Sequence, residues 1–328
     1  MQRADGRILV FDSQVPAIYL FDAQGTFVRQ VGRAGDGPDE YRFPRLVQRL
    51  ADDQVVVSDG ARHRLFVLDS ALRFGGVQGR GGVTKGLIWT PVGVLADGTG
   101  VAKFTSYPPF GPPGRLDSLP SVIALISPTG QPTDTLGRFI DGTQWLNKLI
   151  RGKYQGRGPQ RFAWALHAVT DGTCVYALEG RRARIIRYHV RAARVDTLEW
   201  AASPAPLPRK DRETVRRTFM AMKTDPEVWA DVEFSPTKPV LGAPLIDREG
   251  NLWAITASSP FGVSPDSAFV FDTTGRRVAI VTFPEHFTPR EIGADYVIGQ
   301  RYDDDGVPII VRFPLRKSAV LAEGPARH

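Results

Sequence analysis

The chain repeats one short pattern, in which an apolar run of β-branched or aromatic residues is followed by Asp or Ser, two variable residues, Gly and a second apolar run. Copies lie at residues 19–27, 124–130 and 269–275, with a degenerate copy at 66–70. An Asp side chain can hydrogen-bond its own backbone two residues on, and Gly supplies the positive φ of a tight turn. Each copy therefore predicts a β-hairpin, and repeated hairpins are typical of propellers, solenoids and sandwich arrays.

A second hairpin pattern precedes most copies of the first. Pairs of apolar runs joined by Asp-Gly or a variant of it lie at residues 95–99, 169–173 and 245–253. Two hairpins per repeat make four antiparallel strands, which is the content of one propeller blade. A Gly-Pro phrase at residues 35–44 returns at residues 156–162, and each copy precedes an apolar strand.

The spacing of the hairpins predicts six blades, whose strands we name A to D from the axis outward. The predicted blades occupy residues 7–32, 45–79, 90–138, 162–200, 241–284 and 290–315. No run before Gly6 matches a strand A, so we expect the first blade to begin at strand B and the last to hold three strands. The fold class is therefore an all-β six-bladed β-propeller with incomplete first and last blades, in a single domain over residues 1–328, with a disordered tail at 318–328.

One stretch, residues 207–236, departs from the β pattern. Its apolar residues Val215, Phe219 and Met222 have helical spacing, and Asp211 is a candidate N-cap. Asp225 before Pro226 predicts the start of a second short helix. We expect a small helical insertion between blades four and five that packs over the loop there, with a partner-binding arm as the alternative.

Composition narrows the classes of partner. The formal net charge is +7, but the arginines are scattered and form no stripe, so we predict no nucleic-acid partner. No apolar segment approaches the roughly 18 residues that would cross a bilayer, so we predict no membrane span. The one cysteine, Cys174, lies in an apolar run and is expected to be a buried packing residue. No Cys-His metal pattern occurs, and we expect no metal or cofactor.

The phrase at residues 31–41 resembles the signature between blades of NHL-type propellers, with Tyr41 where Phe is usual. The run from the helical insertion through residues 247–253, 269–275 and 290–299 is similar to bacterial six-bladed propeller proteins, largely without assigned activity. Full-length members of that group usually carry an export or lipoprotein signal, so the resemblance implies a periplasmic or secreted protein. It specifies a fold far better than a function.

The predicted topology sorts the loops by face. Turns from A to B and from C to D are short, whereas the loops from B to C and from D to A share the opposite face and include long ones at residues 79–90, 106–119, 140–161 and 258–267. Long loops on one face of a rigid ring are the usual place for binding. The expected site residues on this long-loop face are cationic, aromatic or histidine side chains: Arg45, His63, Tyr107, Phe110, Arg115, Trp164, His167, Arg181, Arg182, Phe261 and Arg290.

Cations beside aromatic planes suit a protein, a peptide or an anionic small molecule. We therefore expect a non-catalytic binding or scaffold module that acts as a monomer. The competing class is a channel-centred hydrolase or lyase of the lactonase-like propeller type. The resemblance to lactonases would imply a Glu, Asn and Asp metal site, but the chain has only Asn147 and Asn251, and Glu40 is expected to bond its local backbone. That alternative relies on His167, predicted in strand A of blade four.

Two strands are expected to be missing from the first and last blades, which predicts that Met1 is not the natural start and that a signal peptide lies before it. If Met1 is the true start, the sequence instead indicates a cytoplasmic protein.

Overall fold

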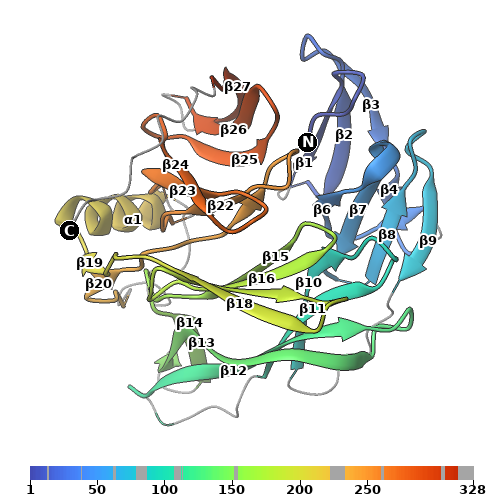
Figure 1. Ribbon diagram of the computed structural model, residues 1–328. Coiled ribbons are helices and arrows are strands. Elements are labelled where there is room, and N and C mark those ends of the chain that lie inside the picture. The colour runs from blue at the N-terminus through green and yellow to red at the C-terminus, as the bar shows by residue number, and fades with distance from the viewer. Residues whose placement is uncertain are drawn as a thin grey trace, which may run out of the picture.

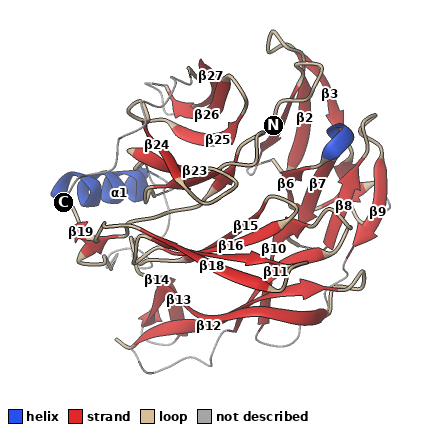
Figure 2. Ribbon diagram, viewed as in Figure 1, coloured by secondary structure: helices blue, strands red, loops and turns tan. Residues whose placement is uncertain are grey.

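The computed structural model describes residues 1–12, 15–37, 39–61, 64–78, 87–106, 112, 114–150, 154–221, 233–259, 262–303 and 307–316. Six antiparallel sheets follow one another around one axis, and the chain is a six-bladed β-propeller (Figures 1 and 2). The inner strands of successive blades contact each other in chain order. This is the predicted fold class.

The strands fall into blades as follows. Blade one is β1 (Ile8–Asp12), β2 (Ala17–Phe21) and β3 (Phe27–Val31). Blade two is β6 (Pro44–Arg49), β7 (Val55–Asp59), β8 (Arg64–Leu68) and β9 (Phe74–Gln78). Blade three is β10 (Leu87–Val94), β11 (Gly100–Ser106), β12 (Leu116–Ile126), β13 (Pro132–Ile150) and β14 (Tyr154–Pro159). Blade four is β15 (Leu166–Thr170), β16 (Cys174–Glu179), β17 (Arg184–His189) and β18 (Arg194–Glu199).

The remaining elements complete the ring. Blade five is β21 (Leu245–Ile246), β22 (Leu252–Ile255), β23 (Ser267–Phe271) and β24 (Arg277–Thr282). Blade six is β25 (Thr288–Ile292), β26 (Tyr296–Tyr302) and β27 (Pro308–Pro314). Outside the blades lie β4 (Arg33–Ala34), β5 (Glu40–Tyr41), β19 (Ala205–Pro206), β20 (Thr237–Lys238) and the helix α1 (Arg209–Ala221). The 3-10 helix η1 (Ala51–Asp53) forms the turn between β6 and β7 of blade two.

Each central strand is buried on both faces, because a blade is packed between two neighbours. Along β22, Leu252 and Ala254 pack in the cluster shared with blade four, while Trp253 and Ile255 pack in the cluster shared with blade six. The two-residue alternation of a strand thus directs successive side chains into different interfaces. This explains why central strands read as continuous apolar runs rather than as alternating ones.

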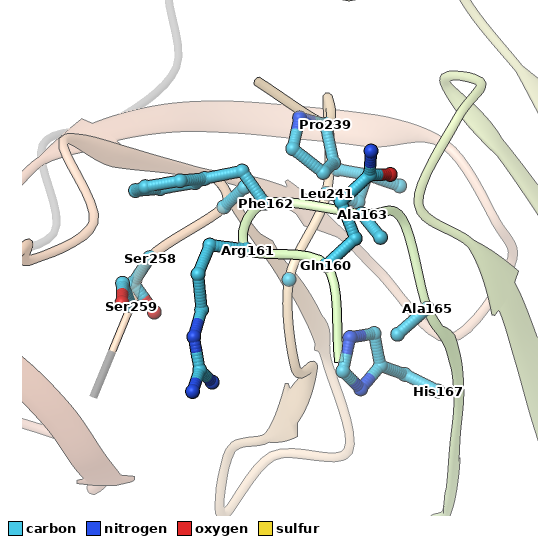
Figure 3. Close-up of a pocket in the computed structure, with 12 residues that line it drawn as sticks. Gln160, Arg161, Phe162, Ala163, Ala165, His167, Pro239, Leu241, Ser258 and Ser259 are labelled. Atoms are coloured by element: carbon cyan, nitrogen blue, oxygen red, sulfur yellow. The ribbon is translucent and has the colours of Figure 1, made fainter. Parts of the chain in front are cut away.

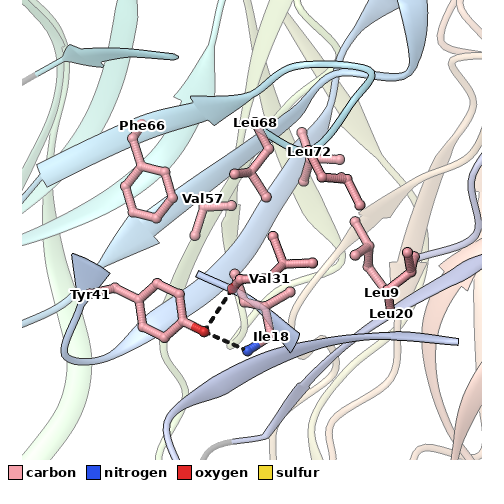
Figure 4. Packing of buried hydrophobic residues seen from close by; sticks show 10 residues of the cluster. Leu9, Ile18, Leu20, Val31, Tyr41, Val57, Phe66, Leu68 and Leu72 are labelled. Atoms are coloured by element: carbon pink, nitrogen blue, oxygen red, sulfur yellow. Dashed lines mark hydrogen bonds between the residues drawn. The ribbon is translucent and has the colours of Figure 1, made fainter. Parts of the chain in front are cut away.

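Blades one and two share a cluster that shows how the Gly-Pro phrase enters the core (Figure 4). Tyr41 is fully buried, and its hydroxyl donates to the Val31 carbonyl over 2.8 Å and accepts from the Ile18 backbone N–H over 3.1 Å. A buried phenol needs such partners, because an unsatisfied hydroxyl in the core costs about 1 to 3 kcal/mol. Tyr41 therefore joins the phrase to β2 and β3.

The expectation that blade one lacks strand A is wrong in part. Residues 1–3 pair along the free edge of β1 through a bridge from Gln2 to Ile8, and Leu9 donates to the Met1 carbonyl over 2.8 Å. The turn between them uses Gly6 at φ 85°, as Gly98 and Gly172 do in the corresponding turns of later blades. The pairing is too short to leave an apolar run, so no strand pattern marks it.

Blade three also differs from the prediction. β13 continues to Ile150 and pairs with β14, so most of the segment 140–161 that we predicted as a loop is strand, and the blade has five strands. The predicted long loop 79–90 overlaps β10 at its end, and its residues 79–86 lie outside the described chain.

The helical insertion lies in the chain between β18 and β21, as predicted. α1 is the one α-helix among the described residues, and it starts at Arg209, after Pro208. Asp211 is therefore in the first helical turn rather than at the N-cap, where its carboxylate lies 3.4 Å from Lys238 Nζ. Val215 is fully buried against Phe162 and Val263, so α1 packs over the entry to blade four and a loop of blade five. The predicted second helix at 225–229 and the predicted tail lie outside the described residues.

None of the helices in the described part of the chain is long and apolar enough to span a membrane.

Candidate functional site

A cavity of about 190 Å³ lies between blades four and five (Figure 3). It is bounded by the segment that enters blade four, the segment that enters blade five and the loop between β22 and β23. These are D-to-A and B-to-C connections, so the cavity is on the long-loop face. Its lining residues are Gln160, Arg161, Phe162, Ala163, Ala165, His167, Pro239, Leu241, Gly242, Ala257, Ser258 and Ser259.

Three of these lining residues, Gln160, Arg161 and Phe162, come from the second copy of the Gly-Pro phrase. Alignment of the two copies places Arg161 at the position of Glu40 and Phe162 at that of Tyr41. Glu40 accepts a hydrogen bond from the Gly37 backbone N–H over 2.6 Å and one from Arg33 Nε, also over 2.6 Å, and these contacts lower the pKa of its carboxyl group. The local role predicted for Glu40 is therefore confirmed. A guanidinium accepts no hydrogen bond, so the second copy cannot form this closure.

The backbone around Arg161 is held from outside its own blade. Arg161 forms a parallel bridge with Phe234, its N–H donates to the Glu233 carbonyl, and its carbonyl accepts from the Ser235 N–H, each bond spanning 2.8 Å. In the first copy, the equivalent parallel bridge joins Glu40 to Arg33, which lies only seven residues earlier. Residues 233–235, which follow the helical insertion, thus pair with Arg161 in the way that Arg33 pairs with Glu40 in the first copy. This pairing fixes the backbone of the cavity wall.

Arg161 brings positive charge to the lining. In the view of Figure 3 its guanidinium extends between Ser259 on one side and the His167 imidazole on the other. Burial lowers the pKa of Arg161, because the partly dehydrated surroundings disfavour the cation. Phe162, which is 8% exposed and adopts a positive φ of 56°, supplies an apolar wall beside it.

His167 lies on β15, the inner strand of blade four, and lines the cavity, as the sequence analysis allowed. No hydrogen bond to its ring nitrogens occurs within the described chain. The pKa of His167 is lowered to about 4, mainly by burial and in addition by the nearby Lys103 ammonium, against the opposing effect of Asp141. The imidazole is therefore neutral near pH 7.

A buried ion pair holds the strand that carries His167. Lys103 Nζ lies 2.9 Å from Asp141 Oδ2 and donates to the Leu166 carbonyl over 2.9 Å, while the Leu166 N–H donates to Asp141 Oδ1 over 3.2 Å. Both backbone groups of Leu166 are therefore fixed by blade three. Because Leu166 is fixed, the imidazole of the adjacent His167 is held at the cavity.

Two predicted site residues contact each other but are not among the residues that line the cavity. The Arg181 guanidinium lies 4.8 Å from the ring centroid of Trp164, a cation–π contact. Gly142 is another neighbour of the indole, and a Cβ added there would lie 1.8 Å from the ring. Trp164 therefore packs on a backbone that only glycine leaves open.

The other predicted residues are dispersed. Arg182 is exposed near Arg181, whereas Arg45, Arg115 and Arg290 lie on blades two, three and six. Arg115 pairs with Asp117 over 2.7 Å and Arg290 donates to Gln300 over 3.1 Å. His63, Tyr107, Phe110 and Phe261 lie outside the described residues.

Arg161, Phe162 and Ser258 line the cavity but are not among the site residues expected from the sequence. A signal for the first two was present, because the second Gly-Pro phrase replaces a backbone-capping Glu by Arg. For Ser258 the signal was its place at the start of the predicted long loop 258–267.

The model of a family described as "6-bladed beta-propeller" matches residues 1–69, in agreement with the six-bladed propeller resemblance inferred from the sequence. No curated protein matches the chain.

Solved structures with a similar fold include a member of the DUF4221 family from Bacteroides vulgatus, with 9% identity, a TM-score of 0.48, and coverage of 97% of this chain and 94% of that one. A Bacteroides fragilis protein described as exported is 16% identical, with a TM-score of 0.42 and coverage of 90% and 77%. A gluconolactonase from Xanthomonas campestris is 16% identical, with a TM-score of 0.40 and coverage of 90% and 79%. Likenesses this distant transfer no activity to this chain.

Proposed function

We propose that the propeller is a binding module that takes a small ligand in the cavity between blades four and five. One observation carries the proposal: the cavity of about 190 Å³ combines apolar walls with a few polar groups from separate segments. Pockets of this kind, at the junction of rigid elements, are the usual form of small-molecule sites. The ion pair behind His167 supports the proposal, because it holds the strand that carries this lining residue in one arrangement.

The test is a pair of alanine-to-tryptophan variants with small-ligand binding as the readout. Ala163 lines the cavity, so Ala163→Trp fills it, whereas Ala192→Trp adds the same side chain to an exposed turn on the other face. A small-molecule library is screened by thermal unfolding, since a ligand at 100 times its Kd adds about 2.7 kcal/mol to stability. We expect hits that are lost in Ala163→Trp and kept in Ala192→Trp. Hits that survive both variants would contradict the proposal.

A channel-centred hydrolase or lyase is the second candidate, because the His167 imidazole lines the cavity. A general base is most effective when its pKa is near the working pH. A pKa of about 4 leaves His167 a weak base at pH 7. Lactone and ester panels assayed with the parent and with His167→Gln test this candidate, and turnover that disappears in the variant would favour it over simple binding.

The export expected from the sequence resemblance belongs to the same proposal, since a module that captures small ligands can work outside the cytoplasm. Fractionation of the native cells, with the mature N-terminus read by mass spectrometry, tests this. Recovery only in the cytoplasm would contradict it.

A further inference from the structure

We infer that the cavity between blades four and five is built for a small uncharged molecule with an apolar body and one hydroxyl group, and that this hydroxyl bonds to the His167 imidazole. This inference rests on the proposed function, since it names the ligand class of the same cavity.

The size of the cavity limits the ligand to roughly a benzene ring with one or two further non-hydrogen atoms. An apolar cavity of about 150 Å³ binds benzene, and the cavity here measures about 190 Å³. The difference exceeds the roughly 30 Å³ that one water molecule occupies in the liquid, so a hydroxyl fits beside a body of that size. A second ring would not fit.

The walls of the cavity suit an apolar body. Phe162 and Leu241 are 8% and 1% exposed, and both line the cavity. The alanines at positions 163, 165 and 257 belong to the same lining, and their short side chains leave space between the larger ones. Small-molecule sites have this composition, in which apolar walls supply the affinity and a few polar groups fix the orientation.

His167 is the polar group that the protein leaves available to a ligand. Its imidazole lines the cavity, and no hydrogen bond to its ring nitrogens occurs within the described chain (Figure 3). A neutral imidazole has one donor and one acceptor nitrogen, and a hydroxyl both donates and accepts, so the two groups match in either tautomer. Because a desolvated polar group without a partner is costly, a ligand hydroxyl at His167 is favoured over an apolar group there.

Two other polar lining residues already have partners. The Gln160 amide donates to the Phe234 carbonyl over 3.4 Å. Arg161 also has an interaction partner within the protein. We therefore assign recognition of the ligand to His167 and not to the guanidinium.

The surroundings of the cavity disfavour an ion. Burial lowers the pKa of both His167 and Arg161, which means that a positive charge is penalised at two points of the lining. The Lys103 ammonium behind the strand opposes a cation further. No Asp or Glu is among the lining residues of the described chain, and an ion that enters without a counter-ion of its own is costly to dehydrate. An uncharged hydroxyl avoids this cost.

Titration calorimetry of the intact chain at pH 7.5 with three probes tests the inference. The probes are para-cresol, anisole and benzoate. Para-cresol and anisole are isomers of nearly equal size, and both are uncharged, but only para-cresol has a hydroxyl. Benzoate has a similar body and a negative charge. We expect para-cresol to bind about tenfold more tightly than either other probe. Equal or tighter binding of anisole or benzoate, or no binding of para-cresol, would overturn the inference.

A variant assigns the preference to the imidazole. His167→Leu removes both ring nitrogens and keeps an apolar side chain, so para-cresol and anisole should bind it about equally. His286→Leu is the matched control, because His286 is exposed in the turn between β24 and β25 and does not line the cavity, and it should leave the preference unchanged. A preference for para-cresol that persists in His167→Leu would overturn the inference. The three probes on the parent chain need no variant, so they remain decisive if His167→Leu does not fold.

The proposed function and the ligand class fail in different ways. If para-cresol and anisole bind equally and both are lost in Ala163→Trp, the binding module stands and the recognition of a hydroxyl is wrong. If library hits are indifferent to Ala163→Trp, the cavity itself is not the binding site.

Discussion

The indole Nε1 of Trp253 donates a hydrogen bond to Asp247 Oδ2 over 3.0 Å, so the aspartate of a hairpin turn is bonded directly to a core side chain between two blades. The same Asp247 carboxylate accepts from the backbone N–H groups of Glu249 and Asn251, over 2.9 and 2.8 Å. Asp247 is 6% exposed and Trp253 is 2% exposed. The repeated turn pattern and the packing of blade five against blade six therefore share one residue.

Trp253→Ala should lower the free energy of unfolding by about 3 to 5 kcal/mol, because it removes a large buried side chain and leaves Asp247 without one of its donors. Urea unfolding measures the loss. Ile280→Ala, which truncates a 59% exposed side chain of the same blade, is the control and should change stability by less than about 0.5 kcal/mol. A loss below about 1 kcal/mol for Trp253→Ala would mean that the two blades are not packed as described.

The free energy of unfolding should decrease as the pH is lowered, because the pKa of His167 is lower in the folded chain than in the unfolded chain. Its pKa is lowered in the folded chain to about 4 from the ordinary value of 6.5, so between these values the unfolded chain binds the proton and the folded chain does not. The stabilisation is fully present above pH 6.5 and is lost as the pH falls towards 4, at about 1.4 kcal/mol per pH unit and at most about 3 kcal/mol in total.

Urea unfolding at pH 7.5 and pH 5 measures this dependence in the parent and in His167→Gln. The variant should lose about 2 kcal/mol less than the parent between the two pH values. Equal losses in both proteins would show that the His167 imidazole is protonated alike in the folded and unfolded chains.

Gly142→Ala should displace Trp164. The added Cβ would lie 1.8 Å from the indole, and overpacking of this kind costs about 1 to 3 kcal/mol. Gly75→Ala is a matched control in a strand of blade two, because its Cβ would meet only a carbonyl at 3.4 Å. We expect destabilisation in urea for the first variant and little change for the second, and unaltered stability of Gly142→Ala would contradict the described packing of Trp164.

The Cys174 thiol should react slowly with a disulfide reagent while the chain is folded. It is 6% exposed, its Sγ lies 3.3 Å from His189 Nδ1, and burial together with the Asp171 charge raises its pKa. Because the thiolate is the reactive species, modification at pH 8 should be at least about tenfold slower than in urea. Equal rates would show an accessible thiol.

The hairpins, the number of blades and their approximate boundaries could be predicted from the sequence. Asp and Gly at a turn act on the backbone within a few residues, and each strand carries its own apolar run, so both signals are local. The two-residue alternation along β22 also places Trp253 between blades five and six. Residues 1–3 escaped prediction because three residues that pair only with β1 form no periodic run.

The cavity was decided by the tertiary structure. Its lining comes from residues 160–167, 239–242 and 257–259, which have no local signal in common and meet only because blades four and five pack side by side. Arg161 is held by a bridge to Phe234 across the whole helical insertion, whereas Glu40 in the matching phrase is held by its near neighbours. The sequence by itself determined the repeating hairpins and blades, because turn chemistry and strand alternation act over a few residues. Only the packing of distant segments decided that the cavity forms at the second copy of the Gly-Pro phrase, between blades four and five.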